Sequence, residues 1–77
     1  MNTYPIKEED SKRIENTFMY HAPKDGQQDK YRAIREEAKT FAYLLIESCP
    51  PSRELSLAIT KLEETVMWAN SAIARNE

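Results

Sequence analysis

Hydrophobic residues recur at steps of three and four along most of this chain, which is the spacing of an amphipathic helix. Two such stripes are separated by Pro50 and Pro51, which lack the backbone donors that a helix needs. We therefore expect a helix over 27–48 and another over 52–75, joined by a short turn that makes them antiparallel. The stripes comprise Tyr31, Ile34, Ala38, Phe41 and Leu45, and then Leu55, Ile59, Leu62, Val66, Ala69 and Ile73.

Capping signals agree with these two helices. Ser52 is a suitable N-cap for the last helix, because its hydroxyl can accept from a free backbone N–H of the first turn. Asp25 can cap the middle helix in the same way, with Gln28 three residues later at the capping-box position. Pro23 keeps the preceding residue out of helical geometry, so the segment before Asp25 is predicted to be a loop.

A shorter helix is predicted over 6–18. Pro5 suits a helix start, and Ile14 and Phe18 stand four residues apart on one narrow apolar stripe. The predicted fold class is all-α: a single domain, residues 1–77, with a short N-terminal helix packed across a long antiparallel hairpin.

The hydrophobic core of such a hairpin is thin. A chain of 77 residues buries only about 60% of the surface that its unfolded form exposes. Cys49 is the sole cysteine, so an intrachain disulfide cannot add stability. Met67 and Trp68 lie off the hairpin stripes, and either the first helix covers this surplus apolar surface or a second subunit does. We expect a homo-oligomer.

Charge and composition exclude several classes of function. The chain carries 11 Lys and Arg against 13 Asp and Glu, which argues against binding long duplex DNA or RNA. The longest apolar run, 41–46, is too short to span a membrane. The N-terminus lacks the apolar stretch of a signal peptide, and a single cysteine is typical of a reducing cytosol.

Catalytic and metal-binding patterns are also lacking. His21 is the only histidine, so no Ser-His-Asp set can be assembled, and Cys49 at a helix end is better explained as a packed small side chain than as a nucleophile. No metal-ligand spacing and no glycine-rich phosphate loop is present. We expect neither enzymatic activity nor a cofactor.

Two features have the aromatic and basic side chains that are suited to binding a nucleotide. In the predicted loop, Tyr20 and His21 provide stacking faces close to the charge of Lys24, and Phe18 either adds a third face or belongs to the core. The second feature is a basic stripe along the middle helix, formed by Arg32, Arg35 and Lys39. It is either a ligand-binding edge or an ordinary charged surface in which Arg32 pairs with Glu36. Arg75 can either stabilise the negative C-terminal end of its helix dipole or bind a phosphate.

Four motifs together resemble one family, the small anti-CBASS sponges by which phages bind the cyclic oligonucleotide messengers of bacterial immunity. The resemblance covers roughly residues 18–77, and its last motif is the most specific. The motifs are F-x-Y-H-A-P at 18–23, Y-x-x-I-R-x-x-A-K at 31–39, C-P-P-S-R-E-x-S-L-A at 49–58 and L-E-x-x-V-M-W-A-N-x-A-I-A-R-N-E at 62–77.

The resemblance implies a homohexamer in the host bacterial cytoplasm. Such a hexamer holds cyclic dinucleotides such as cGAMP between protomers, and in some members cyclic trinucleotides at separate sites, without cleaving them. Since the family's dinucleotide pocket uses a tyrosine and a cation, the resemblance implies Tyr20 with either Lys24 or Arg35 for the dinucleotide, and Arg75 for the trinucleotide. His21, next to Tyr20 in the loop, is a further candidate ligand-binding residue. The alternative from another class is a protein–protein adaptor that docks a partner helix on Met67 and Trp68.

Overall fold

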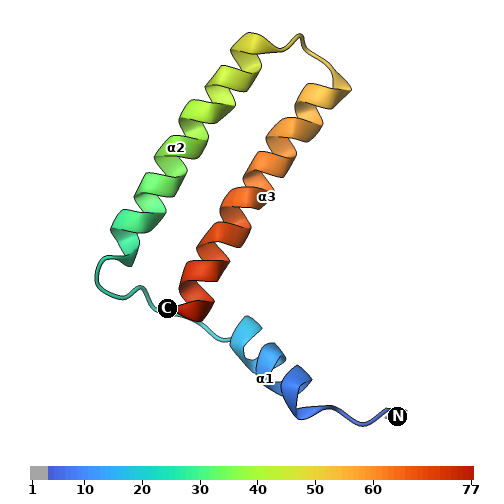
Figure 1. Ribbon diagram of the computed structural model, residues 1–77, viewed down its shortest axis with the longest axis vertical. Helices are drawn as coiled ribbons and strands as arrows, with labels where there is room; N and C mark the ends of the chain where they lie inside the picture. Colours follow the sequence, from blue (N-terminus) through green and yellow to red (C-terminus); the bar gives the residue numbers. More distant parts are fainter. Residues whose placement is uncertain (1–3) are drawn as a thin grey trace.

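A computed structural model describes residues 4–77 and shows three helices: α1 (Glu8–Thr17), α2 (Gln27–Ser48) and α3 (Arg53–Asn76) (Figure 1). No strand occurs in this part of the chain, so the predicted all-α class is confirmed. The bounds of α2 coincide with the predicted range, whereas α1 is shorter than predicted, because the backbone at Lys7 is still extended.

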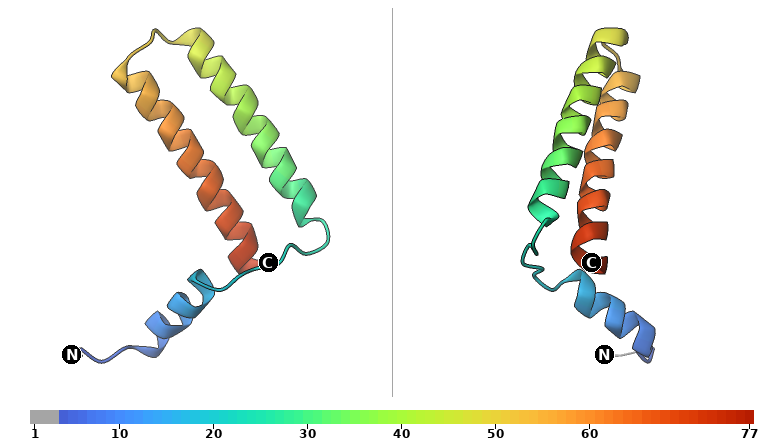
Figure 2. Two further views of the ribbon diagram at one scale, coloured as in Figure 1. Left: turned by 180° about the vertical axis from the view of Figure 1, so that it is seen from behind. Right: turned by 60° about the vertical axis from the view of Figure 1, so that its left-hand side comes forward.

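The helices α2 and α3 form the predicted antiparallel hairpin and lie side by side in all three views (Figures 1 and 2). At the turn, Cys49 is extended (φ −117°, ψ 140°), as a residue before proline prefers. Ser52 caps α3 as predicted, because its Oγ accepts from the backbone N–H of Leu55 at 3.1 Å. The same hydroxyl donates to the carbonyl of Pro50 at 3.0 Å, which fixes the end of the turn.

The first helix does not lie where the sequence predicts. Helix α1 extends away from the end of the hairpin opposite the Pro-Pro turn, instead of packing across the two seams (Figures 1 and 2). Of the helix pairs, only α2 and α3 pack extensively against each other. The physical reason is that α1 has little to bury: its apolar stripe is Ile14 followed by Phe18, and its first turn carries three acidic residues. The expected cover of the hairpin by α1 is therefore wrong.

The start of α2 also differs from the prediction, because Asp25 does not cap the helix. Gly26 occupies the N-cap position with φ 84°, a left-handed conformation that only glycine adopts without strain, and no side chain caps the helix there. Gln27 turns back instead, and its Oε1 accepts from the N–H of Lys24 at 2.9 Å. The N–H of Gln27 donates to the carbonyl of Lys24 at 3.0 Å, so the two residues close the loop reciprocally.

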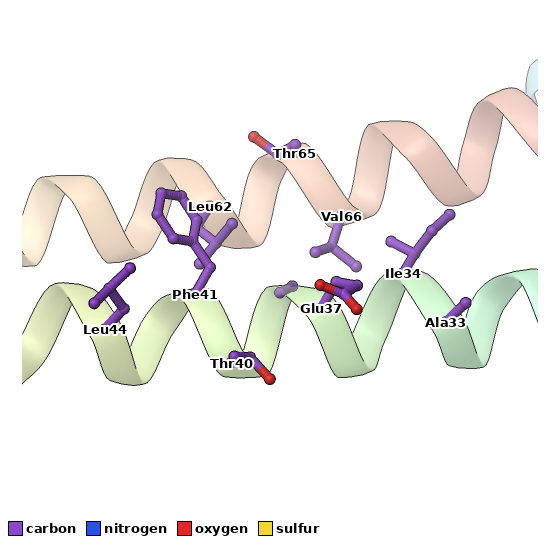
Figure 3. A pocket seen from close by; sticks show the side chains of 10 residues that line it. Ala33, Ile34, Glu37, Thr40, Phe41, Leu44, Leu62, Thr65 and Val66 are labelled. Atoms are coloured by element: carbon purple, nitrogen blue, oxygen red, sulfur yellow. The ribbon is translucent and has the colours of Figure 1, made fainter.

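Within residues 4–77 no hydrophobic side chain is buried. Even seam residues are only partly covered, and Phe41 remains 49% exposed. An apolar groove of about 630 Å³ runs along one side of the seam (Figure 3). Trp68 is 65% exposed and lies one turn beyond Thr65, on the same side of α3. The groove is lined mainly by Ala33, Ile34, Phe41, Leu44, Leu62 and Val66.

Candidate ligand-binding site

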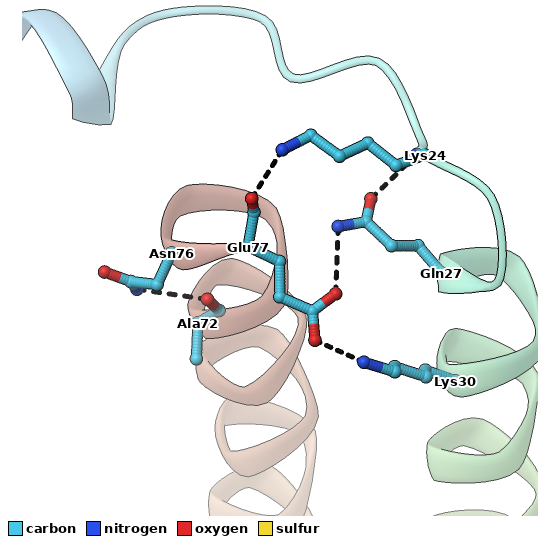
Figure 4. Close-up of polar contacts among 6 residues, drawn as sticks. All are labelled: Lys24, Gln27, Lys30, Ala72, Asn76 and Glu77. Carbon is cyan, nitrogen blue, oxygen red and sulfur yellow. Dashed lines mark hydrogen bonds and ion pairs between the residues drawn. The ribbon is translucent and has the colours of Figure 1, made fainter.

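Three segments meet at the end of the hairpin opposite the Pro-Pro turn, which we call the open end. They are the end of α1 with the connection that follows it, the first turn of α2 and the last turn of α3 (Figures 1 and 4). The antiparallel arrangement of two helices of similar length brings residues near 27 beside residues near 77. Most of the predicted site residues lie here.

The open end is held together by a polar cluster, the Glu77 clamp, formed by Lys24, Gln27, Lys30 and Glu77 (Figure 4). Gln27 Nε2 donates to Glu77 Oε1 at 3.1 Å, and the Lys30 ammonium binds Glu77 Oε2. Lys24 Nζ donates to the main-chain oxygen of Glu77. One acidic residue thus occupies two cations and one amide donor.

Gln27 is the anchor of this clamp. It is only 3% exposed and is the one buried residue of the described chain, 4–77. Both ends of its amide are used, since Oε1 accepts from Lys24 N–H while Nε2 donates to Glu77. A buried amide with both ends hydrogen-bonded has a defined orientation, so its N–H group points at the carboxylate.

These donors favour the ionised form of Glu77. The hydrogen bond from Lys30, followed by that from Gln27, lowers the pKa of Glu77 below its ordinary value of 4.5, although partial desolvation acts in the opposite direction. Charges on Lys30 and Lys24 add to the lowering. The clamp is therefore a site that prefers an anion over a neutral acid.

A second connection links α1 to the open end. Asn16 Nδ2 donates to the carbonyl of Arg75 at 3.4 Å, and His21 Nε2 donates to the carbonyl of Asn16 at 2.9 Å. His21 is half-buried, so its ring is fixed beside the last turn of α1. The main chain of Arg75 lies next to this link, and its side chain is half-exposed at the end of α3.

Tyr20, the predicted aromatic contact, is 83% exposed and is the third residue after the end of α1 at Thr17. Its ring is therefore accessible to a ligand or to another protomer. Phe18 is equally exposed and lines a hollow on α1 together with Ile6 and Ile14. The interpretation of Phe18 as a core residue is wrong, because α1 does not pack over the hairpin.

Arg35 does not lie at the open end. It is eight residues along α2 from Gln27, about 12 Å of helix rise. Together with Lys39 it borders a shallow groove on the side of the seam opposite the larger apolar groove. Arg32 pairs with Asp29 at 3.6 Å and not with Glu36 as expected, which leaves the basic stripe interrupted by an acidic partner.

The structure thus brings Tyr20, His21, Lys24 and Arg75 to one end of the hairpin and leaves Arg35 more than two turns away. The sequence prediction missed Asn16, Gln27, Lys30 and Glu77, which complete the open end. The Lys30–Glu77 pair could have been predicted from the sequence. In an antiparallel hairpin the start of the first helix lies beside the end of the second, and opposite charges placed there are expected to pair. Gln27 gave no such signal, because nothing in the pattern marks a buried glutamine.

Possible catalytic groups are kept apart by the same hairpin. Cys49 lies at the Pro-Pro turn and His21 at the open end, so the length of α2, about 33 Å, separates them (Figure 1). Within residues 4–77 no group of three or more His, Cys, Asp or Glu side chains is placed to hold a metal ion. In that same part of the chain, no helix is long and apolar enough to cross a membrane.

Comparison with protein families gives a match over residues 10–74 to the model described as "Acb2/Tad1, hairpin domain". The chain belongs to this family. The match includes all of α2 and most of α1 and α3, and the family is the anti-CBASS sponge family that the four sequence motifs resemble, so that resemblance is confirmed. Comparison with curated proteins and with solved structures gives no match.

Proposed function

We propose that this protein sequesters cyclic dinucleotides, and cyclic trinucleotides at separate sites, without cleaving them. It would act as a homohexamer in the cytoplasm of the infected bacterium and keep the messenger away from the effector of CBASS immunity. The observation that carries the proposal is membership of the Acb2/Tad1 hairpin family over residues 10–74.

Self-association is supported by the exposed apolar surface. The hairpin buries no hydrophobic side chain in the described residues, and a folded domain depends mainly on such burial. The groove over Phe41, Leu44 and Leu62 is a continuous apolar surface of the kind found at subunit interfaces. Packing protomers through this groove would supply the core that one chain lacks.

A ligand site between protomers is supported by the positions of the candidate residues. Tyr20 is exposed and can stack on a base. Lys24 already binds the main chain of Glu77, whereas Arg35 lies along α2. A pocket that uses Tyr20 with Arg35 would combine two protomers, and one that uses Lys24 requires this lysine to change partner. We propose Arg75, at the end of α3, for the trinucleotide, and His21 as a second stacking face beside Tyr20.

Sequestration without cleavage is supported by the separation of reactive groups. A phosphodiesterase needs a base, a nucleophile or a metal-bound water at one place. His21 is held by the carbonyl of Asn16 at the open end, and Cys49 lies at the opposite end of α2. In residues 4–77 the two groups therefore lie too far apart to activate water together.

Calorimetry of the purified protein against a panel of cyclic di- and trinucleotides tests the proposal. We expect saturable binding of at least one cyclic dinucleotide and no binding of the matching linear dinucleotide. The adaptor alternative is favoured by the exposure of Met67 and Trp68, although consecutive helical residues point about 100° apart and form no single patch. An adaptor would gain no thermal stability from any cyclic nucleotide in the panel.

A further inference from the structure

The Glu77 carboxylate sits where a phosphate of a ligand could sit. We propose that Gln27 and Lys30 form an anion-binding site for one phosphate of the cyclic nucleotide, and that Glu77 fills this site as an internal competitor in the free protein. The identity of the ligand rests on the proposed function. The site itself rests on the geometry of the Glu77 clamp.

The clamp has the features of a prepared anion site. Gln27 is buried and its amide N–H is fixed toward the occupant, because Lys24 N–H holds the amide oxygen at 2.9 Å. Lys30 adds an ammonium from the first turn of α2, where the helix dipole also favours negative charge. A carboxylate and a phosphate present the same kind of acceptor oxygens to these donors. The bound carboxylate of Glu77 therefore shows which ligand chemistry the site accepts.

The site faces α3 and not the loop. On the loop side a polar hollow is lined by Lys24 together with Asp25 and Asp29, whose carboxylates would repel a phosphate. On the α3 side the donors of Gln27 and Lys30 converge on one acidic residue, Glu77. A phosphate entering from this side replaces one negative charge by another and leaves no cation unpaired.

The internal contact is weak enough to be displaced. The side chains of Lys30 and Glu77 are 54% and 39% exposed, so water and salt compete with their ion pair. A cyclic dinucleotide brings two phosphates and two bases, whereas Glu77 brings one carboxylate. The apparent affinity for the cyclic dinucleotide is the affinity of the open clamp multiplied by the fraction of molecules in which the clamp is open.

Calorimetry on Glu77→Gln measures this competition. Loss of the charge should tighten binding of a cyclic dinucleotide by about three- to tenfold, since the variant has a smaller closed fraction. The matched control is Glu47→Gln, an exposed glutamate at the other end of α2, which should bind like the parent. In the background of Lys30→Ala, the additional Glu77→Gln change should give no gain. Equal affinity of the parent and Glu77→Gln would overturn the competitor role.

A second measurement does not depend on the nucleotide. The side-chain amide of Gln27 is followed by NMR while inorganic pyrophosphate is added to the parent and to Glu77→Gln. We expect a saturable shift at a lower pyrophosphate concentration in the variant. No shift in either protein would refute the anion site. If pyrophosphate shifts Gln27 while no cyclic nucleotide binds, the anion site stands and the proposed function fails.

Discussion

Gln27 Nε2 donates a hydrogen bond to Glu77 Oε1 at 3.1 Å across a sequence separation of 50 residues. This contact joins the first residue of α2 to the residue that follows α3. The hairpin is therefore fastened at both ends, by the covalent Pro-Pro turn at one and by a polar contact at the other. Tyr20, His21, Lys24 and Arg75 lie at the polar end, so its chemistry bears on stability and on the proposed binding.

The buried amide of Gln27 should make a measurable contribution to stability. Gln27→Ala removes the acceptor for Lys24 N–H and the donor to Glu77, at a cost of about 0.5–1.5 kcal/mol for each hydrogen bond. Urea denaturation at one fixed protein concentration measures the change. Gln28→Ala, an exposed neighbour in the same helical turn, is the control. A free energy of unfolding equal to that of the control would show that Gln27 does not anchor the open end.

Acid should weaken the clamp. The hydrogen bond from Lys30 lowers the pKa of Glu77 in the folded state below its ordinary 4.5. The stabilisation is therefore fully present above pH 4.5, the value for the unfolded chain, and is lost as the pH falls through the lower pKa of the folded state. Thermal melts from about pH 7 to about pH 3 should show a steeper acid loss for the parent than for Glu77→Gln. Parallel curves would contradict the assignment.

The apolar groove should be required for assembly. Leu44→Asp places a charge in the groove at a side chain that is 55% exposed in the single hairpin, and an unpaired charge at a buried interface is strongly unfavourable. Light scattering on a size-exclusion column should give the mass of six 9.0 kDa chains for the parent and a smaller species for the variant. Thr60→Asp, exposed on the side of α3 away from the seam, should leave the assembly intact. A parent protein that elutes as a monomer would exclude both the hexamer and a pocket between protomers.

Tyr20 should carry much of the dinucleotide affinity. Base stacking on an aromatic ring is worth about 1–3 kcal/mol, so Tyr20→Ala should weaken binding by about tenfold or more without changing the oligomer. Tyr43→Ala, another exposed tyrosine but near the Pro-Pro turn, is the control. Parent-like affinity in Tyr20→Ala would place the site elsewhere even if the protein is a sponge.

The same calorimetric assay should distinguish the roles of the three candidate cations, Lys24, Arg35 and Arg75. One of Lys24→Ala and Arg35→Ala should weaken dinucleotide binding, since a charge-assisted hydrogen bond is worth about 1.5–3 kcal/mol. Arg75→Ala should spare dinucleotides and weaken only trinucleotides. If Arg75→Ala affects both ligands equally, the two ligands share a site and the proposal of separate sites is wrong.

The sequence predicted the hairpin well because its signals are local. The heptad-like spacing around Phe41 and Leu62 and the stop at Pro50 determine two helices and their turn, and Ser52 marks the start of the second. The position of α1 could not be predicted in the same way, since the stripe of Ile14 and Phe18 is equally compatible with packing on the hairpin and with remaining exposed.

The candidate site was predictable in part. The segment from Tyr20 to Lys24 combines aromatic and basic side chains, and such a combination can be recognised in a sequence. The roles of Gln27 and Glu77 depend on contacts between residues 50 positions apart, and no periodicity reports such contacts. The family resemblance supplied the kind of ligand, which neither helix spacing nor charge balance could have supplied.

A sponge must hold a cyclic nucleotide and release it unchanged. Equilibrium dialysis with a labelled cyclic dinucleotide, followed by denaturation and chromatography of the bound fraction, tests both halves at once. We expect retention of the label on the protein side and full recovery of the intact cyclic compound. Absence of retention, or recovery of a linear or hydrolysed product, would contradict it.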